Sequence, residues 1–247
     1  MNTSPCAIIL AGGRGTRISH LEPHLPKPLI PAAGRPFIEW VIRQLQSQGV
    51  GRFVVSLGHL AEVAEAYFRE RPADELSIKT VRETEPLGTG GGFLLAQQAA
   101  GDADPLLLAN GDSLVLADLA GVWRQFEDST VDGVVVGLEV DDAARYGGLD
   151  VDGEGRLLEF REKRPGAGLI NAGVYCFRRG LLASFPRRRP LSMELDVFPA
   201  LLEQRAKLMV HRSTAPFLDI GTPESLTQAD AFLSRHWPSH DLATVLK

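Results

Sequence analysis

Residues 6–17 read CAIILAGGRGTR, an apolar run of strand length followed at once by a glycine-rich segment. A continuous apolar run bounded by glycine is typical of a strand that is buried on both faces of a parallel sheet. Gly12, Gly13 and Gly15 allow the backbone to approach an anion closely, and Arg17 adds positive charge. The stretch therefore predicts a strand that leads into an anion-binding loop, with a solvent-exposed turn as the alternative.

Similar apolar runs recur along the first half of the chain, and we expect each to be a strand buried on both faces. The predicted strands are 6–11, 52–58, 76–83, 105–112 and 132–140. Apolar residues repeat with helical spacing between the first two runs, over 37–45, and between the second and third, over 63–68. Strands that alternate with helices predict an α/β fold with a doubly wound, mostly parallel sheet (Rossmann-like), whose ligands bind at the carboxyl ends of the strands.

The rhythm changes from about Tyr146, where the apolar runs become shorter and two helical stretches, 192–204 and 222–233, lie among them. We interpret this part as the far edge of the sheet with a small added β-rich lobe. The sequence contains no internal repeat and no low-complexity tract. It therefore predicts a single domain over residues 1–235, followed by a C-terminal tail at 236–247.

Composition favours a small-molecule ligand. The formal net charge of -5 and the pI near 5.7 disfavour nucleic acid and anionic lipid as partners, because both repel a negatively charged protein. Cys6 and Cys176 lie in apolar runs, so we expect buried free thiols rather than a disulfide. No apolar run approaches the ~18 residues of a membrane span, and no signal-type start is present, so a cytoplasmic location is expected.

The glycine-rich segment fits neither of two common phosphate-binding signatures. The Walker pattern G-x-x-x-x-G-K-[ST] is absent, and Ile18 stands where a dinucleotide fingerprint needs its third glycine. Arg14 and Arg17 in the segment, and Lys27 in LPKPL, supply cationic donors that suit a polyphosphate.

Two carboxylates and one lysine end other apolar runs. Asp112 follows LLLANG and Asp219 follows FL, so both could hold Mg²⁺ against a phosphate if the fold brings them together. A simple turn or helix cap is the alternative for Asp112. Lys163 in FREKRP could bind a further anion, and a solvent-facing charge is the alternative.

An ordered set of motifs gives these residues a context. LAGGRGTR, LPKPLIPAAGRPFIEW, EPLGTGGG, LANGD, REK, LINAGVY and LDIGTPES resemble, in this order and spacing, the sugar-1-phosphate nucleotidylyltransferase family up to about Phe232. EPLGTGGG, LINAGVY and SMELDVFP are similar in particular to the glycero-manno-heptose 1-phosphate guanylyltransferases. Mannose-1-phosphate guanylyltransferases and muramate-type uridylyltransferases share much of the same pattern.

The resemblance implies a reaction in which the phosphate of a sugar 1-phosphate attacks the α-phosphorus of a nucleoside triphosphate. The products are a nucleotide-sugar, of the kind used for cell-envelope glycans, and pyrophosphate, with no covalent enzyme intermediate. Such a transfer needs in-line positioning and charge neutralisation more than acid or base chemistry. The nucleotide-binding half would cover about residues 1–112 and the sugar-phosphate-binding half about 113–235. A homo-oligomer is compatible with the family.

The resemblance also assigns residues. Lys27 would neutralise charge at the α-phosphate, Lys163 would bind the sugar phosphate, and Asp112 and Asp219 would hold Mg²⁺, the expected cofactor. Catalytic roles would fall to Arg17, Lys27, Asp112, Lys163 and Asp219. Nucleotide binding would fall to Leu10, Ala11, Gly12, Gly13, Gly15, Thr16, Glu83, Gly88, Thr89 and Gly111.

Base recognition is expected in RETEPLGTGGG, with Glu83 facing the base. A carboxylate only accepts hydrogen bonds, so it suits the N1–H and N2–H₂ donors of guanine and disfavours adenine. The imide N–H of uracil or thymine could also donate to Glu83, and Glu85 is the alternative base-facing residue. Thr89 could instead serve to open the helix that follows it.

The sugar phosphate would be bound by Gly147, Glu162, Lys163 and Asn171, according to the same resemblance. Amide and carboxylate side chains can bind vicinal hydroxyls, but Asn171 could instead fix a turn between strands.

Other polar patterns have ordinary explanations. His20 with His24, and His236 with His240, lack neighbouring acids or cysteines in a metal-binding pattern, so solvated histidines are favoured. The arginine run 187–189 is interpreted as a solvated loop, with contact to a partner subunit or an anion as the alternative.

Two other functions are compatible with this fold. One is a non-catalytic nucleotide-sugar-binding subunit, which is disfavoured because phosphate- and metal-ligand candidates are all present together. The other is guanylyl transfer to a pterin-type cofactor, which the LPKPL, NAG and DIGTP stretches disfavour.

Overall fold

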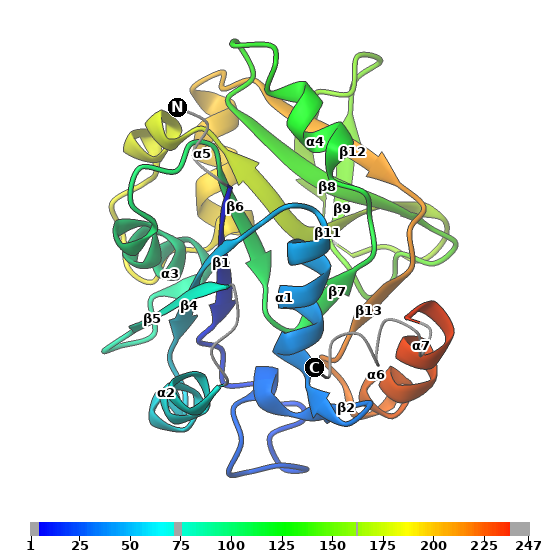
Figure 1. Ribbon diagram of the computed structural model, residues 1–247. Helices are drawn as coiled ribbons and strands as arrows, with labels where there is room; N and C mark the ends of the chain where they lie inside the picture. The colour runs from blue at the N-terminus through cyan, green and yellow to red at the C-terminus, as the bar shows by residue number, and fades with distance from the viewer. Residues whose placement is uncertain (1–4, 72–75, 162, 238–247) are drawn as a thin grey trace.

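Four parallel strands form the first half of a nine-stranded sheet in the computed structural model, which describes residues 5–71, 76–161 and 163–237 (Figure 1). Their order is β5-β4-β1-β6, and all neighbouring pairs are parallel. The strands are β1 (Cys6–Ala11), β4 (Arg52–Leu57), β5 (Ser77–Arg82) and β6 (Leu106–Asn110). Four of the five strands predicted from apolar runs are therefore confirmed as a parallel core.

The second half of the sheet is mixed. Strand β11 (Gly168–Phe177) pairs antiparallel with β6, β8 (Gly133–Val140) pairs antiparallel with β11, and β12 (Leu208–Ser213) pairs parallel with β8. The predicted strand 132–140 exists and runs in the same direction as β6. It does not pair with the parallel core, however, because β11 lies between them.

Strand β5 is less buried than its sequence predicts. The run 76–83 was expected to be buried on both faces, but β5 lies at the sheet edge and its residues are exposed or half-buried. An edge strand has a neighbour on one side only, so polar residues such as Lys79 can alternate with Ile78.

The added β-rich lobe is confirmed. Strands β9 (Gly148–Val151) and β10 (Leu157–Arg161) pair antiparallel, and β9 joins the sheet beside the first residues of β11. Two small antiparallel sheets lie apart from the large one. They pair β2 (Pro31–Ala32) with β3 (Arg35–Pro36) and β7 (Ser113–Val115) with β13 (Phe217–Asp219).

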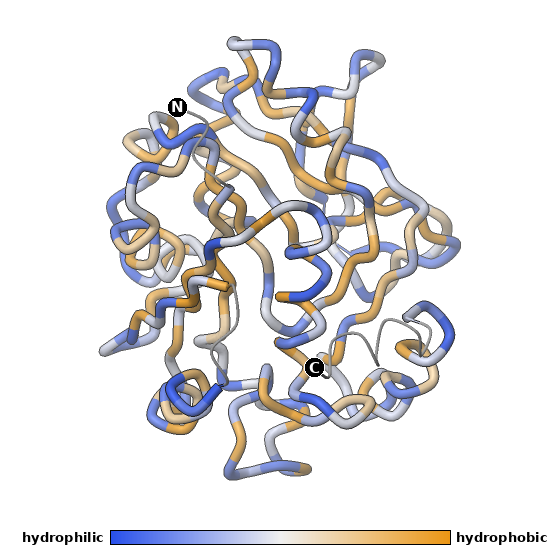
Figure 2. The backbone as a smooth tube through the Cα atoms, in the orientation of Figure 1, coloured by the Kyte–Doolittle hydropathy of each residue, from blue (hydrophilic) through white to orange (hydrophobic). Residues whose placement is uncertain are grey.

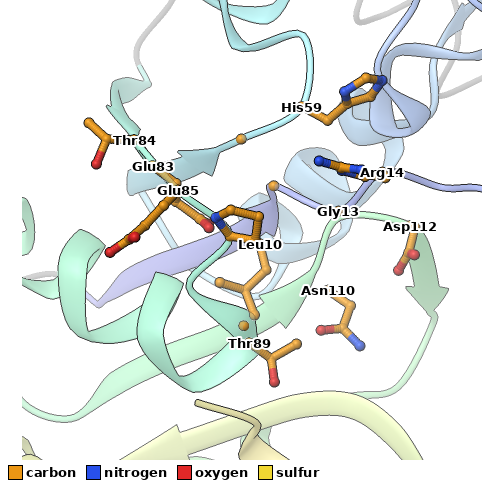
Figure 3. A pocket seen from close by; sticks show the side chains of 14 residues that line it. Leu10, Gly13, Arg14, His59, Glu83, Thr84, Glu85, Thr89, Asn110 and Asp112 are labelled. Atoms are coloured by element: carbon orange, nitrogen blue, oxygen red, sulfur yellow. The ribbon is translucent and has the colours of Figure 1, made fainter. Parts of the chain in front are cut away.

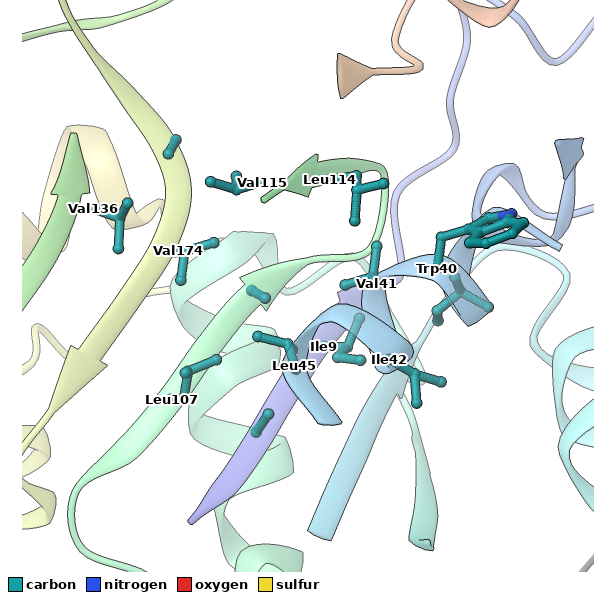
Figure 4. Close-up of a cluster of buried hydrophobic side chains, with 14 of the residues drawn as sticks. Ile9, Trp40, Val41, Ile42, Leu45, Leu107, Leu114, Val115, Val136 and Val174 are labelled. Carbon is teal, nitrogen blue, oxygen red and sulfur yellow. The ribbon is translucent and has the colours of Figure 1, made fainter. Parts of the chain in front are cut away.

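Helices cover both faces of the sheet, as a doubly wound fold requires. One buried cluster joins Ala7 and Ile9 of β1 to helices α1, α2, α4 and α7, while a second joins Cys6 and Ile8 to α3 and α5. Successive residues of β1 thus point to opposite cores, and Figure 4 shows the α1 side chain Leu45 next to Ile9. The α-helices are α1 (Phe37–Ser47), α2 (Ala61–Glu70), α3 (Gly88–Ala96), α4 (Ala120–Gln125), α5 (Phe198–Glu203), α6 (Pro223–Thr227) and α7 (Ala229–His236).

Shorter helical turns complete the chain. They are η1 (Lys27–Leu29), η2 (Gln97–Ala100), η3 (Arg179–Ser184) and the π-helical turn η4 (Met193–Val197). The helical stretches predicted at 192–204 and 222–233 correspond to η4 with α5 and to α6 with α7. Apolar residues concentrate on the central strands, coloured orange in Figure 2.

Both cysteines are buried and free, as predicted. Burial raises the pKa of the Cys6 thiol and, more strongly, that of Cys176, so both stay protonated. Among the described residues, no helix combines the length and the apolar character that crossing a membrane requires.

Candidate active site

The glycine-rich loop leaves β1 at the carboxyl edge of the parallel strands and borders two pockets. Leu10, Gly12 and Gly13 line the first pocket, of about 490 Å³. Leu10, Ala11, Gly13, Gly15, Thr16 and Arg17 line the second, of about 230 Å³. Because the loop lies at the strand ends, its backbone is placed where an α/β sheet binds ligands.

The first pocket lies between the glycine-rich loop and the segment that joins β5 to α3 (Figure 3). Asn110 and Asp112, at the end of β6, lie on the opposite side from Glu83 and Glu85. Its remaining lining residues are Arg14, Gly58, His59, Thr84, Pro86, Gly88 and Thr89.

Glu83 lies beneath the glycine-rich loop with both carboxylate oxygens held. Oε1 accepts a hydrogen bond from Ser56 Oγ at 3.1 Å, and Oε2 accepts one from the Leu87 N–H at 3.2 Å. Any side chain on Gly12 would collide with this carboxylate, so glycine lets the loop pass directly over it. Glu85, the alternative base-facing residue, is exposed and pairs with Arg189 at 3.3 Å.

Lys27 and Asp112 form an ion pair in the second pocket. The Lys27 Nζ lies 2.6 Å from Asp112 Oδ2, and the lysine side chain is 9% exposed whereas the aspartate is 35% exposed. Among the described lining residues, Arg17 is the other cation of this pocket. The pocket is small, polar and bordered by backbone of the glycine-rich loop, which suits a phosphate group.

Asp112 and Asp219 are brought together by a long-range strand pair. Asp219 ends β13 and lies opposite Ser113 of β7, the residue after Asp112. The N–H of Ile220 donates to the Asp112 carbonyl at 3.1 Å, and the Asp219 carboxylate accepts from the Gly221 N–H. The fold thus brings together the two chain segments that carry these acids, and their role as ligands of one metal ion stays a prediction.

A third pocket, of about 660 Å³, opens on the side of β9, β10 and β11. The predicted residues Arg17, Gly147, Lys163, Asn171 and Asp219 line it. Residues that sequence reasoning did not single out also line it, including Asn110, Arg145, Tyr146 and Glu194.

The three pockets share residues at their borders. Asp112 lines the first and second, Asn110 the first and third, and Arg17 the second and third. Two of these borders lie at the end of β6 and the third at Arg17, so ligands in the first and third pockets would face each other across Asn110. The arrangement can hold two ligands with anionic groups directed at one point.

Two predicted residues lie elsewhere. Gly111 is buried, and its N–H donates to the Leu10 carbonyl at 2.8 Å, so it ties β6 to the start of the glycine-rich loop. Glu162 lies outside the described residues.

Asn110 was not predicted as a site residue, although its position at the end of the apolar run in LLLANGD indicates that it lies at the ligand-binding edge of the sheet. Glu194 had no such signal beyond its place in SMELDVFP, because its approach to the third pocket depends on how η4 packs.

The histidine pairs and the arginine run do not form a metal site among the described residues. Among the described residues, no group of three or more histidine, cysteine, aspartate or glutamate side chains could hold a metal ion. His240 lies outside the described residues. In the arginine run, Arg188 pairs with Asp196 at 2.9 Å and Arg189 with Glu85, and both arginines are exposed.

The protein has a doubly wound sheet whose strand ends carry a glycine-rich loop, a lysine–aspartate pair and three adjoining pockets. These features define an α/β protein of the nucleotide-binding class. The sequence profile described as Nucleotidyl transferase matches residues 6–236, and the chain belongs to this family. The resemblance to sugar-1-phosphate nucleotidylyltransferases is thereby confirmed.

Particular relatives are similar over most of the chain. A mannose-1-phosphate guanylyltransferase from Mycobacterium tuberculosis is 35% identical over 93% of this chain and 64% of its own length. The chain thus spans less than two thirds of that relative. A D-glycero-alpha-D-manno-heptose 1-phosphate guanylyltransferase from Aneurinibacillus thermoaerophilus is 31% identical over 93% of this chain and 99% of its own length.

The fold agrees with solved structures. The crystal structure of HddC from Yersinia pseudotuberculosis has a TM-score of 0.78 and 32% identity, covering 92% of this chain and 98% of that chain. The same protein has been solved complexed with GMP-PN, with equal similarity.

Proposed function

We propose that this protein joins a sugar 1-phosphate to a nucleoside triphosphate and releases pyrophosphate. The observation that carries the proposal is that three adjoining pockets share the border residues Asn110, Asp112 and Arg17, with cationic groups in the second and third. The nucleoside would occupy the first pocket, its phosphates the second, and the sugar phosphate the third. This arrangement supports the division of the proposed domain 1–235 into a nucleotide-binding half, about 1–112, and a sugar-phosphate-binding half, about 113–235. The first pocket is lined by residues up to Asp112, and most of the third by later ones.

Positioning and charge neutralisation would carry the reaction. Lys27, now paired with Asp112, would donate to the triphosphate as charge grows at the α-phosphorus, while Arg17 would bind oxygens of the leaving pyrophosphate. Lys163 would hold the attacking phosphate of the sugar in the third pocket. Direct in-line attack needs no nucleophilic side chain, so the enzyme's contribution is to align two anions that repel each other.

The two acids fit a magnesium ion. Mg²⁺ prefers oxygen ligands and is commonly held by one or two carboxylates together with substrate phosphates. Asp112 lines the second pocket just before β7, and Asp219, which lines the third pocket, ends the strand β13 that pairs with β7. When bound, the ion would neutralise phosphate charge as a Lewis acid. Asp112 would then exchange its contact with Lys27 for one with the ion.

GTP is the proposed nucleotide. The names of the similar guanylyltransferases support it, as does the acceptor-only carboxylate of Glu83 on the wall of the first pocket. Ser56 and the Leu87 N–H hold this carboxylate in place, and its remaining acceptor capacity would take the N1–H and N2–H₂ of guanine.

The proposed sugar is D-glycero-D-manno-heptose 1-phosphate, and mannose 1-phosphate is the second candidate. Relatives carrying each name are similar to this chain, at 31% and 35% identity. The two sugars share a manno-configured ring, so the ring-binding residues would serve either one.

Substrate identity is tested by pyrophosphate release with Mg²⁺, each of GTP, UTP, CTP, ATP and dTTP, and heptose, mannose, glucose and N-acetylhexosamine 1-phosphates. We expect release with GTP and a manno-configured sugar. Release with UTP or dTTP instead would keep the mechanism but overturn the assignment of guanine as the base. No release with any pair, while nucleotide still binds, would favour a non-catalytic binding subunit.

A further inference from the structure

Glu194 is a carboxylate on the wall of the third pocket that the reaction described above does not use. It lies in the π-helical turn η4, and three hydroxyl groups hold it. Its Oε1 accepts from Tyr175 Oη at 3.1 Å, while its Oε2 accepts from Ser192 Oγ at 3.1 Å and from Thr89 Oγ1 at 3.5 Å.

The direction of this hydrogen-bond chain is fixed by Tyr175. The tyrosine is 1% exposed, and burial together with the nearby Glu194 carboxylate raises the pKa of its phenol, so it remains protonated. Asn171 Nδ2 donates to the tyrosine oxygen at 2.6 Å, which leaves the phenol proton for Glu194. The chain therefore runs from Asn171 through Tyr175 to Glu194.

Both ends of this chain keep unused hydrogen-bonding capacity, and both line the third pocket. The Asn171 Oδ1 accepts from the Gly173 N–H at 3.0 Å, but the second proton of Nδ2 has no role in these contacts. A carboxylate offers about four acceptor positions, and the three hydroxyls on Glu194 leave one. One donor and one acceptor thus line the same pocket.

The negative charge of Glu194 determines which chemical group of a ligand it can bind. Among the described residues, Glu194 has no ion-pair partner, and the three hydroxyls that hold it carry no charge. A phosphate group would be repelled by it and attracted to Arg145, Arg161 and Lys163 on the same pocket. The group that suits a carboxylate held only by hydroxyls is another hydroxyl donor.

Backbone contacts hold Glu194 in a fixed position. The Leu191 N–H donates to the Leu87 carbonyl at 2.7 Å, the Gly90 N–H donates to the Leu191 carbonyl at 2.8 Å, and the Met193 N–H donates to Thr89 Oγ1 at 2.8 Å. Gly88 has φ +76°, and a side chain there would collide with the Leu191 carbonyl. The carboxylate therefore needs little reorganisation to bind a ligand.

We propose that Glu194 determines sugar specificity by accepting a hydrogen bond from a ring hydroxyl of the sugar, while Asn171 donates to that hydroxyl or its neighbour. The inference rests on the proposed function, because it takes the third pocket as the sugar site. It adds a residue that recognises the sugar ring, separate from those that hold its phosphate.

The test compares wild-type protein with Glu194→Ala, Glu194→Gln and Tyr175→Phe, and with Glu203→Gln as a control on the exposed end of α5. Each is assayed by pyrophosphate release from GTP and α-D-mannose 1-phosphate, and from its 2-, 3- and 4-deoxy analogues. Losing one hydrogen bond to a charged group predicts a rise of about 10- to 100-fold in KM for mannose 1-phosphate in Glu194→Ala.

Several readouts separate recognition from folding. We expect the KM for GTP to stay within about twofold, a smaller rise in Glu194→Gln, and no change in Glu203→Gln. Wild-type protein should disfavour at least one deoxy analogue by about tenfold or more, and Glu194→Ala should lose that preference. Tyr175→Phe keeps the carboxylate but removes its positioning hydroxyl, so it should weaken the same preference partly.

The outcomes distinguish this inference from the proposed reaction. If wild-type protein turns over mannose 1-phosphate and Glu194→Ala keeps both its KM and its deoxy preference, Glu194 does not contact the sugar. If wild-type protein turns over no sugar, the proposed function is wrong, and calorimetric titration with mannose 1-phosphate decides the role of Glu194 separately. Weaker binding in Glu194→Ala would then support the inference, and equal binding would overturn it.

Discussion

Replacing Lys27 by methionine removes one of the two cations that line the phosphate pocket, with little change in side-chain length. The lysine side chain is 9% exposed and its Nζ lies 2.6 Å from Asp112, so its charge is held inside the pocket rather than in solvent. Removing one preorganised donor to a developing charge typically lowers kcat by about 10²- to 10³-fold. This corresponds to about 3–4 kcal/mol of transition-state stabilisation.

Stability should change much less than activity. Asp112 loses its partner in this variant, but 35% of its side chain is exposed and water can solvate it. We expect a loss of about 1 kcal/mol in the free energy of unfolding. Pyrophosphate release at saturating GTP measures the rate, and thermal unfolding measures stability.

Lys79→Met is the matched control, because Lys79 is an exposed lysine on the edge strand β5. It should keep wild-type rates. If Lys27→Met keeps its kcat within about fivefold of wild type, the assignment of Lys27 to charge neutralisation is refuted. A large loss of stability in Lys27→Met would instead show that the ion pair serves the fold.

Three further outcomes are expected. Asp112→Asn and Asp219→Asn should each abolish Mg²⁺-dependent turnover with circular dichroism unchanged, and near-normal rates in either variant would remove that carboxylate from the metal site. Lys163→Ala should raise the KM for the sugar 1-phosphate more than that for GTP; the opposite pattern would reassign it to the triphosphate. Burial raises the pKa of Cys6 and Cys176, so native protein at pH 8 should react slowly with a thiolate-specific reagent and denatured protein quickly; equal rates would mean that the thiols are accessible.

Local pattern was enough to predict the parallel core and the loop that follows it. The run 6–11 is apolar on both faces because both faces of β1 are covered by helices, and this leaves a signal in the sequence itself. The glycine-rich loop and Asp112 were found for the same reason, since strand ends can be read directly from where the apolar runs stop.

Contacts between distant segments could not be predicted in this way. Nothing local shows that β11 inserts between β6 and β8, because the pairing depends on how the chain returns after the β9–β10 lobe. The approach of Asp219 to Asp112 likewise depends on the pairing of β7 with β13. Glu194 was missed because its role depends on Tyr175 and Thr89, which lie 19 and 105 residues away.

Attack at the α-phosphorus would be revealed by following radioactive label from GTP. Wild-type protein with Mg²⁺ and a manno-configured sugar 1-phosphate would be supplied with GTP labelled at the α-phosphate or, separately, at the γ-phosphate. We expect the α label in the nucleotide-sugar and the γ label in pyrophosphate. Transfer of the γ label to the sugar, or the absence of any labelled sugar product, would contradict it.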